Sequence, residues 1–316
     1  MLAFPSAHGM KKTLQHALRE RRLVNDGAMG TQLMAAGLEP GGCGEAWNLT
    51  HPERVLAIQR PYVEAGADCL TTNTFGGCRI MLRRHGRGDE VVAINRAGVE
   101  IARQAFGDRP GFVLGDIGPF GGVMAPYGDI EPDEVRRAFD EQAQALVSGG
   151  ADAIIVETQT SLDELGLAID AAKEAAAPCV IASLAFDVSP DGELFRTMMG
   201  VAPEQAAAFA KERGVDIVGL NCGSGIDMIR AQEVVGLYRS ACDLITMVQP
   251  NAGLPVLENL KAVYRQTPEE MVEGVAGLLD AGAGIVGACC GSTPEHIRAI
   301  RNAVDRFEGS GKAGLR

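Results

Sequence analysis

Short apolar segments alternate with helix-like segments along nearly the whole chain, and this alternation constrains the fold more than any other feature. The helix-like segments, such as residues 51–66, 132–150 and 268–282, repeat their apolar residues with the 3.6-residue period of an amphipathic helix. Apolar runs that end in polar or glycine-rich loops are typical of buried parallel strands. Eight such runs occur, at residues 22–30, 67–77, 111–119, 151–160, 178–186, 215–223, 243–251 and 283–291.

Eight strands that alternate with helices predict the α/β class and a (β/α)8 TIM barrel in a single domain. Glycine supports this alternation, because it accepts the left-handed conformation in which many helices end. It precedes four of the predicted strands, in EAGAD, SGGAD, ERGVD and DAGAG. A doubly wound open sheet is the alternative. However, the turn after the first strand, DGAMG, is not the G-x-G-x-x-G loop of a dinucleotide site.

The length of 316 residues suits one barrel, and no segment has the composition of a linker between domains. With 46% hydrophobic and 22% charged residues, the chain is able to bury a large core, and disorder is not expected. We predict an N-terminal helical extension at residues 1–22 that closes the bottom of the barrel. The barrel itself is predicted at residues 23–306 and a flexible tail at residues 307–316.

The formal net charge is −12 and the sequence pI is about 5.0, which argues against nucleic acid or an anionic membrane surface as a partner. The N-terminus lacks the apolar stretch of a signal peptide. No run approaches the roughly 18 apolar residues of a membrane span. We therefore expect a cytoplasmic protein with reduced thiols and with no nucleic-acid or membrane partner.

Three cysteines stand where predicted strands end, namely Cys222 in IVGLNCGSG and the adjacent pair Cys289 and Cys290 in IVGACCGSTPEHI. Three converging thiolates form a soft site that suits zinc, and three protein ligands leave a fourth position open, as in catalytic zinc sites. Two other interpretations stay open. Free cysteine often serves as a small buried hydrophobe, and a vicinal pair can act in redox chemistry. No C-x-x-C pair of the zinc-finger type is present.

Polar residues follow the apolar runs of most predicted strands, at the end of a barrel where active sites form. Burying such residues costs free energy unless they form hydrogen bonds with the protein or with a ligand. Two carboxylates that face a thiolate–metal site would hold the ammonium group of an amino acid by charge-assisted hydrogen bonds. We interpret Asp116 and Asn251 as turn residues, and we place His296 in the first turn of a helix rather than in a metal site. The remaining strand-end candidates are Asp26, Asn73, Thr74, Glu157 and Asn221.

Seven motifs occur in order and with barrel-like spacing: NDGAMGTQL, TNTFGG, GDIGP, VETQT, GLNCGSG, QPNAGLP and GACCGSTPEHI. Together they resemble the homocysteine S-methyltransferase family, from about Leu23 to about Arg301. Within that family they are most similar to the homocysteine-binding N-terminal module of cobalamin-dependent methionine synthase. The resemblance implies a zinc-dependent enzyme that activates the homocysteine thiolate and transfers a methyl group to it, giving methionine.

The resemblance also implies roles for individual residues. One Zn²⁺ would be held by Cys222, Cys289 and Cys290, which makes these cysteines both metal ligands and catalytic residues. Asp26 and Glu157 would bind the amino group of homocysteine. The other residues expected to bind substrate are Asn73, Thr74 and Asn221.

The chain departs from its relatives at two positions. Gly76 stands where betaine-using relatives carry a tyrosine, which makes betaine a weaker candidate as donor. Gln249 stands where methionine-synthase-like sequences more often have an acidic residue. No D-x-H-x-x-G corrinoid motif is present. The expected donor is therefore methylcobalamin on a separate protein, or S-methylmethionine.

The partners implied by the resemblance are homocysteine together with corrinoid-binding and folate-binding proteins. Two alternatives stay open. In the first, the chain is a corrinoid-linked methyltransferase that acts on a methylated amine or sulfur compound. In the second, it is a non-autonomous module or subunit that binds homocysteine.

Overall fold

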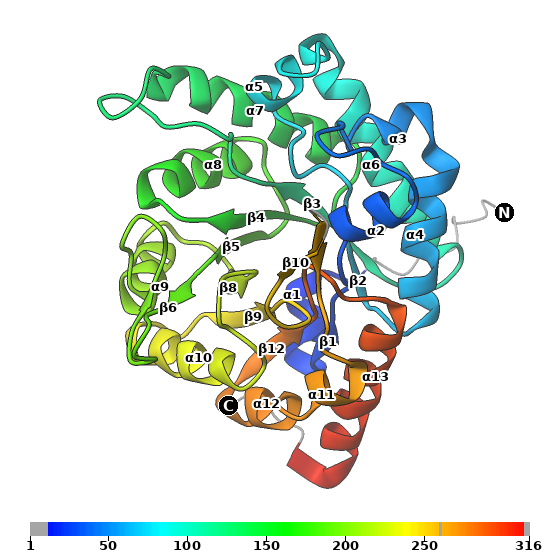
Figure 1. Cartoon of the computed structure of the whole chain (residues 1–316), viewed down its shortest axis with the longest axis vertical. Coiled ribbons are helices and arrows are strands. Elements are labelled where there is room, and N and C mark those ends of the chain that lie inside the picture. Colours follow the sequence, from blue (N-terminus) through cyan, green and yellow to red (C-terminus); the bar gives the residue numbers. More distant parts are fainter. Residues whose placement is uncertain (1–11, 259–260, 313–316) are drawn as a thin grey trace, which may run out of the picture.

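The computed structural model describes residues 12–258 and 261–312, and its centre is an eight-stranded parallel sheet that closes into a barrel (Figure 1). The hydrogen-bonded order is β1-β12-β9-β8-β5-β4-β3-β2, and a bridge between Asn25 and Cys69 joins the two end strands. Each strand lies in one of the eight predicted runs, so the predicted (β/α)8 barrel is confirmed. The strands are β1 (Leu23–Val24), β2 (Cys69–Thr71), β3 (Phe112–Ile117), β4 (Ala153–Gln159), β5 (Val180–Leu184), β8 (Ile217–Asn221), β9 (Ile245–Gln249) and β12 (Ala283–Val286).

Helices follow the strands and cover the outside of the barrel (Figure 1). The long ones are α4 (Pro52–Glu64), α6 (Val91–Phe106), α7 (Pro132–Ser148), α8 (Leu162–Glu174), α9 (Pro203–Glu212), α10 (Arg230–Ala241) and α13 (Pro294–Phe307). Shorter ones lie in the connections: α2 (Gly30–Ala35), α3 (Trp47–Thr50), α5 (Arg79–Arg83), η1 (Gly88–Glu90), α11 (Pro268–Val272) and α12 (Val275–Ala281).

The single helix predicted for residues 268–282 is wrong, because the segment breaks into α11 and α12 at Gly274. This glycine packs tightly against the loop after β8. A Cβ added there would lie 2.6 Å from Met228 Cβ. Close packing between two connections therefore interrupts a helix that the apolar period alone would continue.

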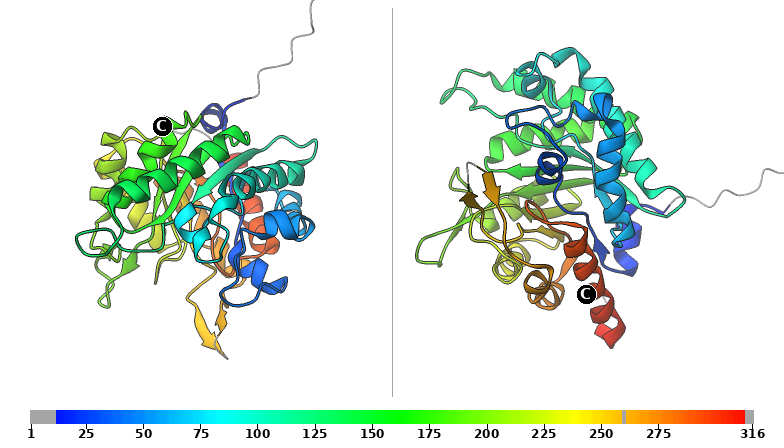
Figure 2. Two further views of the ribbon diagram at one scale, coloured as in Figure 1. Left: turned by 90° about the horizontal axis from the view of Figure 1, so that it is seen from above. Right: turned by 45° about the vertical axis from the view of Figure 1, so that its right-hand side comes forward.

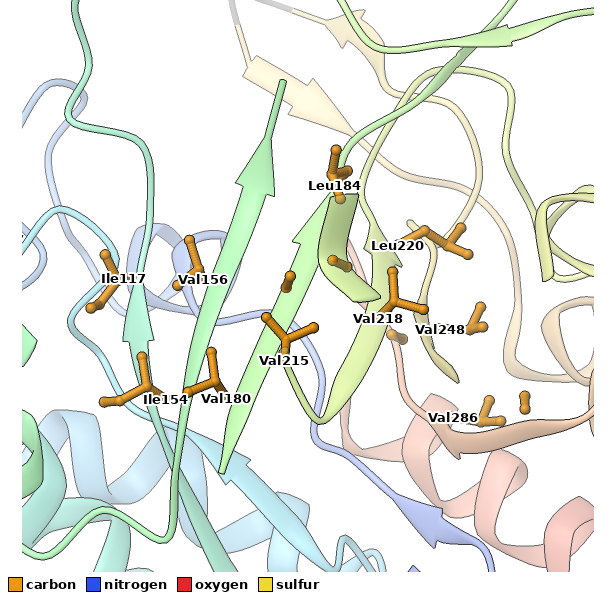
Figure 3. Packing of buried hydrophobic residues seen from close by; sticks show 14 of the residues in the cluster. Ile117, Ile154, Val156, Val180, Leu184, Val215, Val218, Leu220, Val248 and Val286 are labelled. Atoms are coloured by element: carbon orange, nitrogen blue, oxygen red, sulfur yellow. The ribbon is translucent and has the colours of Figure 1, made fainter. Parts of the chain in front are cut away.

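Buried apolar side chains form two layers because successive strand residues point to opposite faces of the sheet. One layer, between the strands and the surrounding helices, includes Ile154, Val156 and Val218 (Figure 3). The other layer fills the inside of the barrel and includes Ile155 and Ile217. Each fully buried aliphatic side chain contributes roughly 1.5–3 kcal/mol, so the two layers make the barrel a rigid support for its loops.

Helix α1 (Leu14–Glu20) packs against the inner layer through Leu14 and Leu18, which are fully buried. Residues 1–11 of the predicted N-terminal extension lie outside the described residues. The predicted tail begins at Phe307, the last residue of α13, and continues into η2 (Glu308–Lys312), where Glu308 Oε1 accepts a hydrogen bond of 2.7 Å from Arg22 N. The last four residues of that tail also lie outside the described range. The boundaries at residues 22 and 307 remain predictions.

Two hairpins extend the loops at the carboxyl ends of the strands. They are β6 (Asp187–Val188) with β7 (Phe195–Arg196), and β10 (Val256–Glu258) with β11 (Lys261–Val263). Figure 2 shows the second hairpin projecting away from the barrel. None of the helices within residues 12–258 and 261–312 has the length and apolar run that crossing a bilayer requires.

Candidate functional site

The three cysteines predicted at strand ends come together at the carboxyl end of the barrel. Cys222 directly follows β8, whereas Cys289 and Cys290 lie in the loop after β12. The Sγ atoms of Cys222 and Cys289 are 2.8 Å apart, and Cys290 Sγ lies 3.8 Å from Cys222 and 3.9 Å from Cys289. All three side chains are partly exposed and none forms a disulfide. The fold therefore brings Cys222 close to two thiols that lie 67 and 68 positions further along the sequence.

The backbone around Cys222 is held in an uncommon conformation. Cys222 has a φ of +53°, in the left-handed region, and Gly223 follows with +76°. A Cβ at Gly223 would lie 2.0 Å from the Phe186 carbonyl oxygen, so only glycine fits there. A non-glycine residue in this region costs about 1–2 kcal/mol, which the surrounding structure must supply. The result is a turn that directs the Cys222 thiol towards the loop after β12.

Asn251 ties the two cysteine loops together. Its Nδ2 donates to the Gly223 carbonyl at 3.1 Å, and its Oδ1 accepts from Cys290 N at 3.1 Å. The interpretation of Asn251 as only a turn residue therefore misses its function in the fold. A single sequence contains no signal for this contact, because it joins three loops that are distant in the chain.

The three thiols fit a zinc ion by their chemistry and by most of their spacing. All three ligand atoms lie within 4.8 Å of one another. Zinc–sulfur bonds of about 2.3 Å in a tetrahedron give sulfur–sulfur edges of about 3.8 Å, and two of the three observed edges match this. The edge between Cys222 and Cys289 is shorter. It would have to lengthen by about 1 Å on metal binding.

The three thiols differ strongly in their acidity. Hydrogen bonds from Cys222, and then from Cys289, lower the pKa of Cys290 to about 3. The hydrogen bond with Cys222 and burial raise the pKa of Cys289 well above its usual range. Within the group, the thiolate form is therefore favoured on Cys290 and disfavoured on Cys289. Metal binding must release the remaining protons, so metal affinity is expected to rise with pH.

A cavity of about 440 Å³ opens beside the cysteines, at the mouth of the barrel. Its polar lining includes Glu45, Asp116, Glu157 and Gln249, and none of its described lining residues is lysine or arginine. A cavity that combines carboxyls with thiols, and whose basic residues include His85 but no lysine or arginine, favours a cationic group on the ligand. Its apolar wall includes Met29, Leu33, Met34, Leu38, Phe75 and Met81.

Glu157, near the end of β4, lines the cavity as predicted for a substrate-binding residue. Burial, and then the negative charge of Cys290, raise its pKa to about 7. Asp116 lines the same cavity, and the two carboxyls influence each other's pKa. Burial and the neighbouring carboxylates raise the pKa of Asp116 well above its usual range.

The interpretation of Asp116 as a turn residue is wrong. Asp116 lies inside β3, is 3% exposed and faces the cavity, and its Oδ1 has no hydrogen-bond partner. A buried carboxyl oxygen without a partner is costly and is therefore available for a ligand. The motif GDIGP suggested a turn because aspartate and glycine favour turns. In fact the apolar run includes the aspartate and continues to Ile117.

Asp26 lies next to this cavity, but its carboxyl is already engaged. Its Oδ2 accepts from Thr71 N at 2.8 Å, and its Oδ1 accepts from Thr71 Oγ1 at 3.1 Å and from Asn25 Nδ2 at 2.8 Å. Asp26 is not among the residues that line the cavity. Burial raises its pKa to about 8, and the charge of Glu157 contributes. Asp26 therefore joins β1 to β2, and burial favours the neutral form of its carboxyl.

Asn73 and Thr74, which follow β2, lie in different environments. Asn73 lines the cavity, while its Nδ2 donates to Gly44 O at 2.9 Å and to Asn48 Oδ1 at 3.0 Å. Thr74 is fully buried behind the wall, and its Oγ1 donates to the Asp116 carbonyl at 2.8 Å. Thr74 therefore supports the position of Asp116 rather than forming part of the cavity surface.

Asn221, the last residue of β8, also acts behind the cavity surface. Its Oδ1 accepts from Thr158 N at 2.9 Å and its Nδ2 donates to Thr158 Oγ1 at 2.7 Å. Thr158 itself lines the cavity and has a φ of +58°. The two hydrogen bonds hold Thr158 in this left-handed conformation, directly beside Glu157. Asn221 therefore shapes the carboxylate side of the site.

Glu45 is a cavity residue that the sequence analysis did not identify. Its Oε1 accepts a hydrogen bond of 2.8 Å from Gly76 N, and a Cβ at Gly76 would meet the same oxygen. The space that a tyrosine side chain would need at position 76 is thus occupied by a carboxylate. Gln249 also lines the cavity, and its Oε1 has no partner.

The raised pKa of Glu157 leads to a prediction about stability in the metal-free protein. A carboxyl whose pKa is higher in the folded state stabilises the fold most below its unfolded pKa, which is 4.5 here. That stability is lost as pH rises towards about 7. Glu157→Gln should therefore match the wild type near pH 4.5 and exceed it by about 1–2 kcal/mol at pH 8, after allowing for solvent in the cavity.

Urea unfolding of both proteins in the presence of a chelator, at several pH values, measures this difference. A variant that is less stable than the wild type at pH 8 would contradict the assigned direction of the pKa shift.

Comparison with known proteins agrees with this geometry. The family described as Homocysteine S-methyltransferase matches residues 23–304. The chain is 36% identical over 316 residues to methionine synthase of Mycobacterium leprae. The alignment covers 95% of this chain and 26% of the relative. It is 37% identical over 308 residues to methionine synthase of Mycobacterium tuberculosis. This alignment covers 92% of this chain and 25% of the relative. The chain thus spans about a quarter of the length of these relatives.

Among solved structures, the metallated form of the homocysteine methyltransferase MmuM from Escherichia coli is similar in fold. It has a TM-score of 0.73 at 20% identity, and the match covers 90% of this chain and 96% of that chain. Because the family match extends over residues 23–304, which includes every strand of the barrel, the chain belongs to the homocysteine S-methyltransferase family.

Proposed function

We propose that the chain is a zinc-dependent methyltransferase that activates the thiol of homocysteine and transfers a methyl group to it, giving methionine. The main support for this proposal is that three cysteine thiols and several carboxyl groups line the same cavity. Zinc held by Cys222, Cys289 and Cys290 would lower the pKa of a thiol bound to it, so that the thiolate exists at neutral pH.

The carboxyls of the cavity account for recognition of the amino group. Glu157 and Asp116 line the same cavity, and Asp116 Oδ1 is free to accept a hydrogen bond. A bound ammonium group would stabilise the charged form of both carboxyls, which burial now disfavours. The pair therefore orients the amino acid with its thiol towards the three cysteines. Holding the nucleophile in this way contributes to rate by fixing the reacting geometry.

The loops at the carboxyl ends of the strands support a donor carried by a macromolecule. Large apolar side chains are exposed on the loops after the strands, and Tyr127 is 87%, Met198 78% and Leu257 71% exposed. Leu257 lies in the projecting β10–β11 hairpin (Figure 2). Exposed apolar groups gathered at one end of a protein mark interaction sites. We therefore propose methylcobalamin on a separate corrinoid protein as donor, with S-methylmethionine as the small-molecule alternative.

A second candidate is a homocysteine-binding module that needs partner domains for turnover. It is favoured by the observation that the chain spans only 26% and 25% of the two methionine synthases that it resembles. In this case corrinoid-binding and folate-binding proteins would supply the donor. The residues that bind homocysteine would be the same.

Methionine formation from homocysteine by the zinc-loaded protein, offered methylcobalamin and S-methylmethionine in parallel, tests the proposal. Methionine from methylcobalamin would support the corrinoid donor, and methionine from S-methylmethionine alone would support a self-sufficient enzyme. If homocysteine binds but neither donor reacts, the module is favoured. If homocysteine does not bind at all, the proposed substrate is wrong.

A further inference from the structure

Strand β3 is longer than its neighbour β2 at the end of the barrel where Asp116 lies. β2 ends at Thr71, whereas β3 continues to Ile117. The main-chain bonds between these strands reach as far as Thr72 N, which donates to Leu114 O at 2.9 Å. Further along β3, the buried N and O of Asp116 need other partners, because a buried peptide group without a hydrogen bond is costly. Side chains provide those partners.

Two threonine hydroxyls close a ring of hydrogen bonds on the backbone of Asp116. Asp116 N donates to Thr72 Oγ1 at 3.0 Å, and Thr74 Oγ1 donates to Asp116 O at 2.8 Å. The two hydroxyl oxygens are 2.6 Å apart. A carbonyl only accepts and a threonine hydroxyl has one proton, so the proton of Thr74 is committed to Asp116 O. The bond between the hydroxyls must therefore be donated by Thr72.

A glutamine from outside the barrel strengthens this ring. Gln142, in α7, is fully buried, and its Nε2 donates to Thr74 O at 2.8 Å and to Asp116 O at 3.2 Å. A Cβ added at Gly77 would lie 2.9 Å from the same nitrogen, so glycine leaves the space that Gln142 occupies. Hydroxyl and amide groups thus take the place of the missing strand beside Asp116.

The carboxyl of Asp116 faces the cavity, and its Oδ1 has no hydrogen-bond partner. The direction of this oxygen therefore depends on the backbone that carries it. Thr72 lines the same cavity, but its only proton is donated to Thr74. Thr72 is for this reason not available as a donor to a ligand, and its effect on the site passes through Asp116.

We propose that Thr72 is a positioning residue, whose hydroxyl holds the backbone of Asp116 in the strand conformation and so directs the Asp116 carboxyl towards the ammonium group of the substrate. This inference rests on the proposed function, in which Asp116 and Glu157 bind that group. A correctly oriented carboxylate makes a charge-assisted hydrogen bond, which is roughly twice as strong as a neutral one.

Thr72→Val tests the proposal because valine keeps the shape of threonine and removes the hydroxyl. Binding of homocysteine to the zinc-loaded protein, measured by calorimetric titration, should weaken by about tenfold, because the displaced carboxylate loses much of its hydrogen bond to the ammonium group. Zinc content should not change. Thr72→Ser keeps the hydroxyl and should bind homocysteine as the wild type does.

The double variant separates action through Asp116 from direct contact with the substrate. Asp116→Asn alone should weaken homocysteine binding by about 10–100-fold. When Thr72→Val is added to Asp116→Asn, little further loss is expected, since the charge that Thr72 positions is already absent. Two residues that contact the substrate independently would instead give losses that multiply.

Thr246→Val is the matched control. Thr246 is also a fully buried threonine of the barrel, and its Oγ1 donates to Gly282 O at 3.4 Å, but it does not line the cavity. Its variant should bind homocysteine with the affinity of the wild type. An equal loss of affinity in Thr246→Val and Thr72→Val would indicate a general effect on the barrel and would overturn the positioning role.

The other outcomes also distinguish this inference from the proposed function. If the wild type does not bind homocysteine, the proposed function is wrong and the role of Thr72 falls with it. If the wild type binds it, the proposed substrate stands, and wild-type affinity in Thr72→Val or in Asp116→Asn overturns the positioning role alone. Losses that multiply in the double variant, or a Thr72→Ser variant as weak as Thr72→Val, overturn it as well.

Discussion

Replacing Cys289 by serine should leave a folded barrel that binds almost no zinc and forms almost no methionine. The same result is expected for Cys222→Ser and Cys290→Ser. A hydroxyl is a poor ligand for zinc, and two thiolates alone do not make the three-ligand site of a catalytic zinc. Loss of a direct ligand should exceed the roughly 10–100-fold loss that follows removal of an outer-shell partner. Zinc content after gel filtration and the rate of methionine formation measure the two effects.

Cys242→Ser is the control for this prediction, because Cys242 is a buried free cysteine at the end of α10, outside the group of three. It should keep its zinc and its activity. The circular dichroism spectrum shows whether each variant is folded, since the barrel is held by its apolar layers and not by the metal. Full zinc content in all three cysteine variants would rule out the proposed metal site.

Replacing Glu157 by glutamine should weaken homocysteine binding by about 10–100-fold and leave zinc content unchanged. A hydrogen bond to a charged group contributes about 1.5–3 kcal/mol, and each 1.4 kcal/mol corresponds to a factor of ten in the dissociation constant. Glutamine keeps the size and one acceptor oxygen of the side chain but removes the negative charge that faces the ammonium group. Calorimetric titration of the zinc-loaded protein with homocysteine measures the dissociation constant.

Glu164→Gln provides a matched control. Glu164 is also a buried carboxyl, and burial also raises its pKa to about 7. However, it lies in α8 and accepts a hydrogen bond from Phe120 N at 2.7 Å, and it is not among the residues that line the cavity. Its variant should bind homocysteine as the wild type does. An unchanged affinity in Glu157→Gln would remove Glu157 from its proposed role, and an equal loss in both variants would indicate a general effect on the fold.

Much of the fold is predictable from the sequence because each barrel strand is a short apolar run between recognisable helix signals. Thr267 illustrates this at the start of α11, where its side chain and that of Glu270 form the reciprocal capping hydrogen bonds that T-x-x-E predicts. The break between α11 and α12 at Gly274 was not predictable in the same way. It depends on contact with Met228, which lies in a different connection.

In the candidate site, too, some features are predictable from the sequence and others depend on tertiary contacts. The three cysteines could be selected from the sequence because each follows an apolar run, and parallel strands end on the same side of a barrel. Asp116 was missed because aspartate between glycine and isoleucine resembles a turn, whereas the structure continues the strand through it. The separate environments of Asn73, Thr74 and Asn221 depend on side-chain directions that residue type does not specify.

By itself, the sequence determined the eight strands, their order and the end of the barrel at which functional residues gather, because these follow from local periodicity and from the rules for parallel sheets. Only the tertiary structure decided which of those residues meet. The three thiols come within 4.8 Å of one another because Cys222 adopts a left-handed turn and Asn251 bridges its loop to that of Cys290. Contacts of this kind join loops that are far apart in the chain, so no local pattern encodes them.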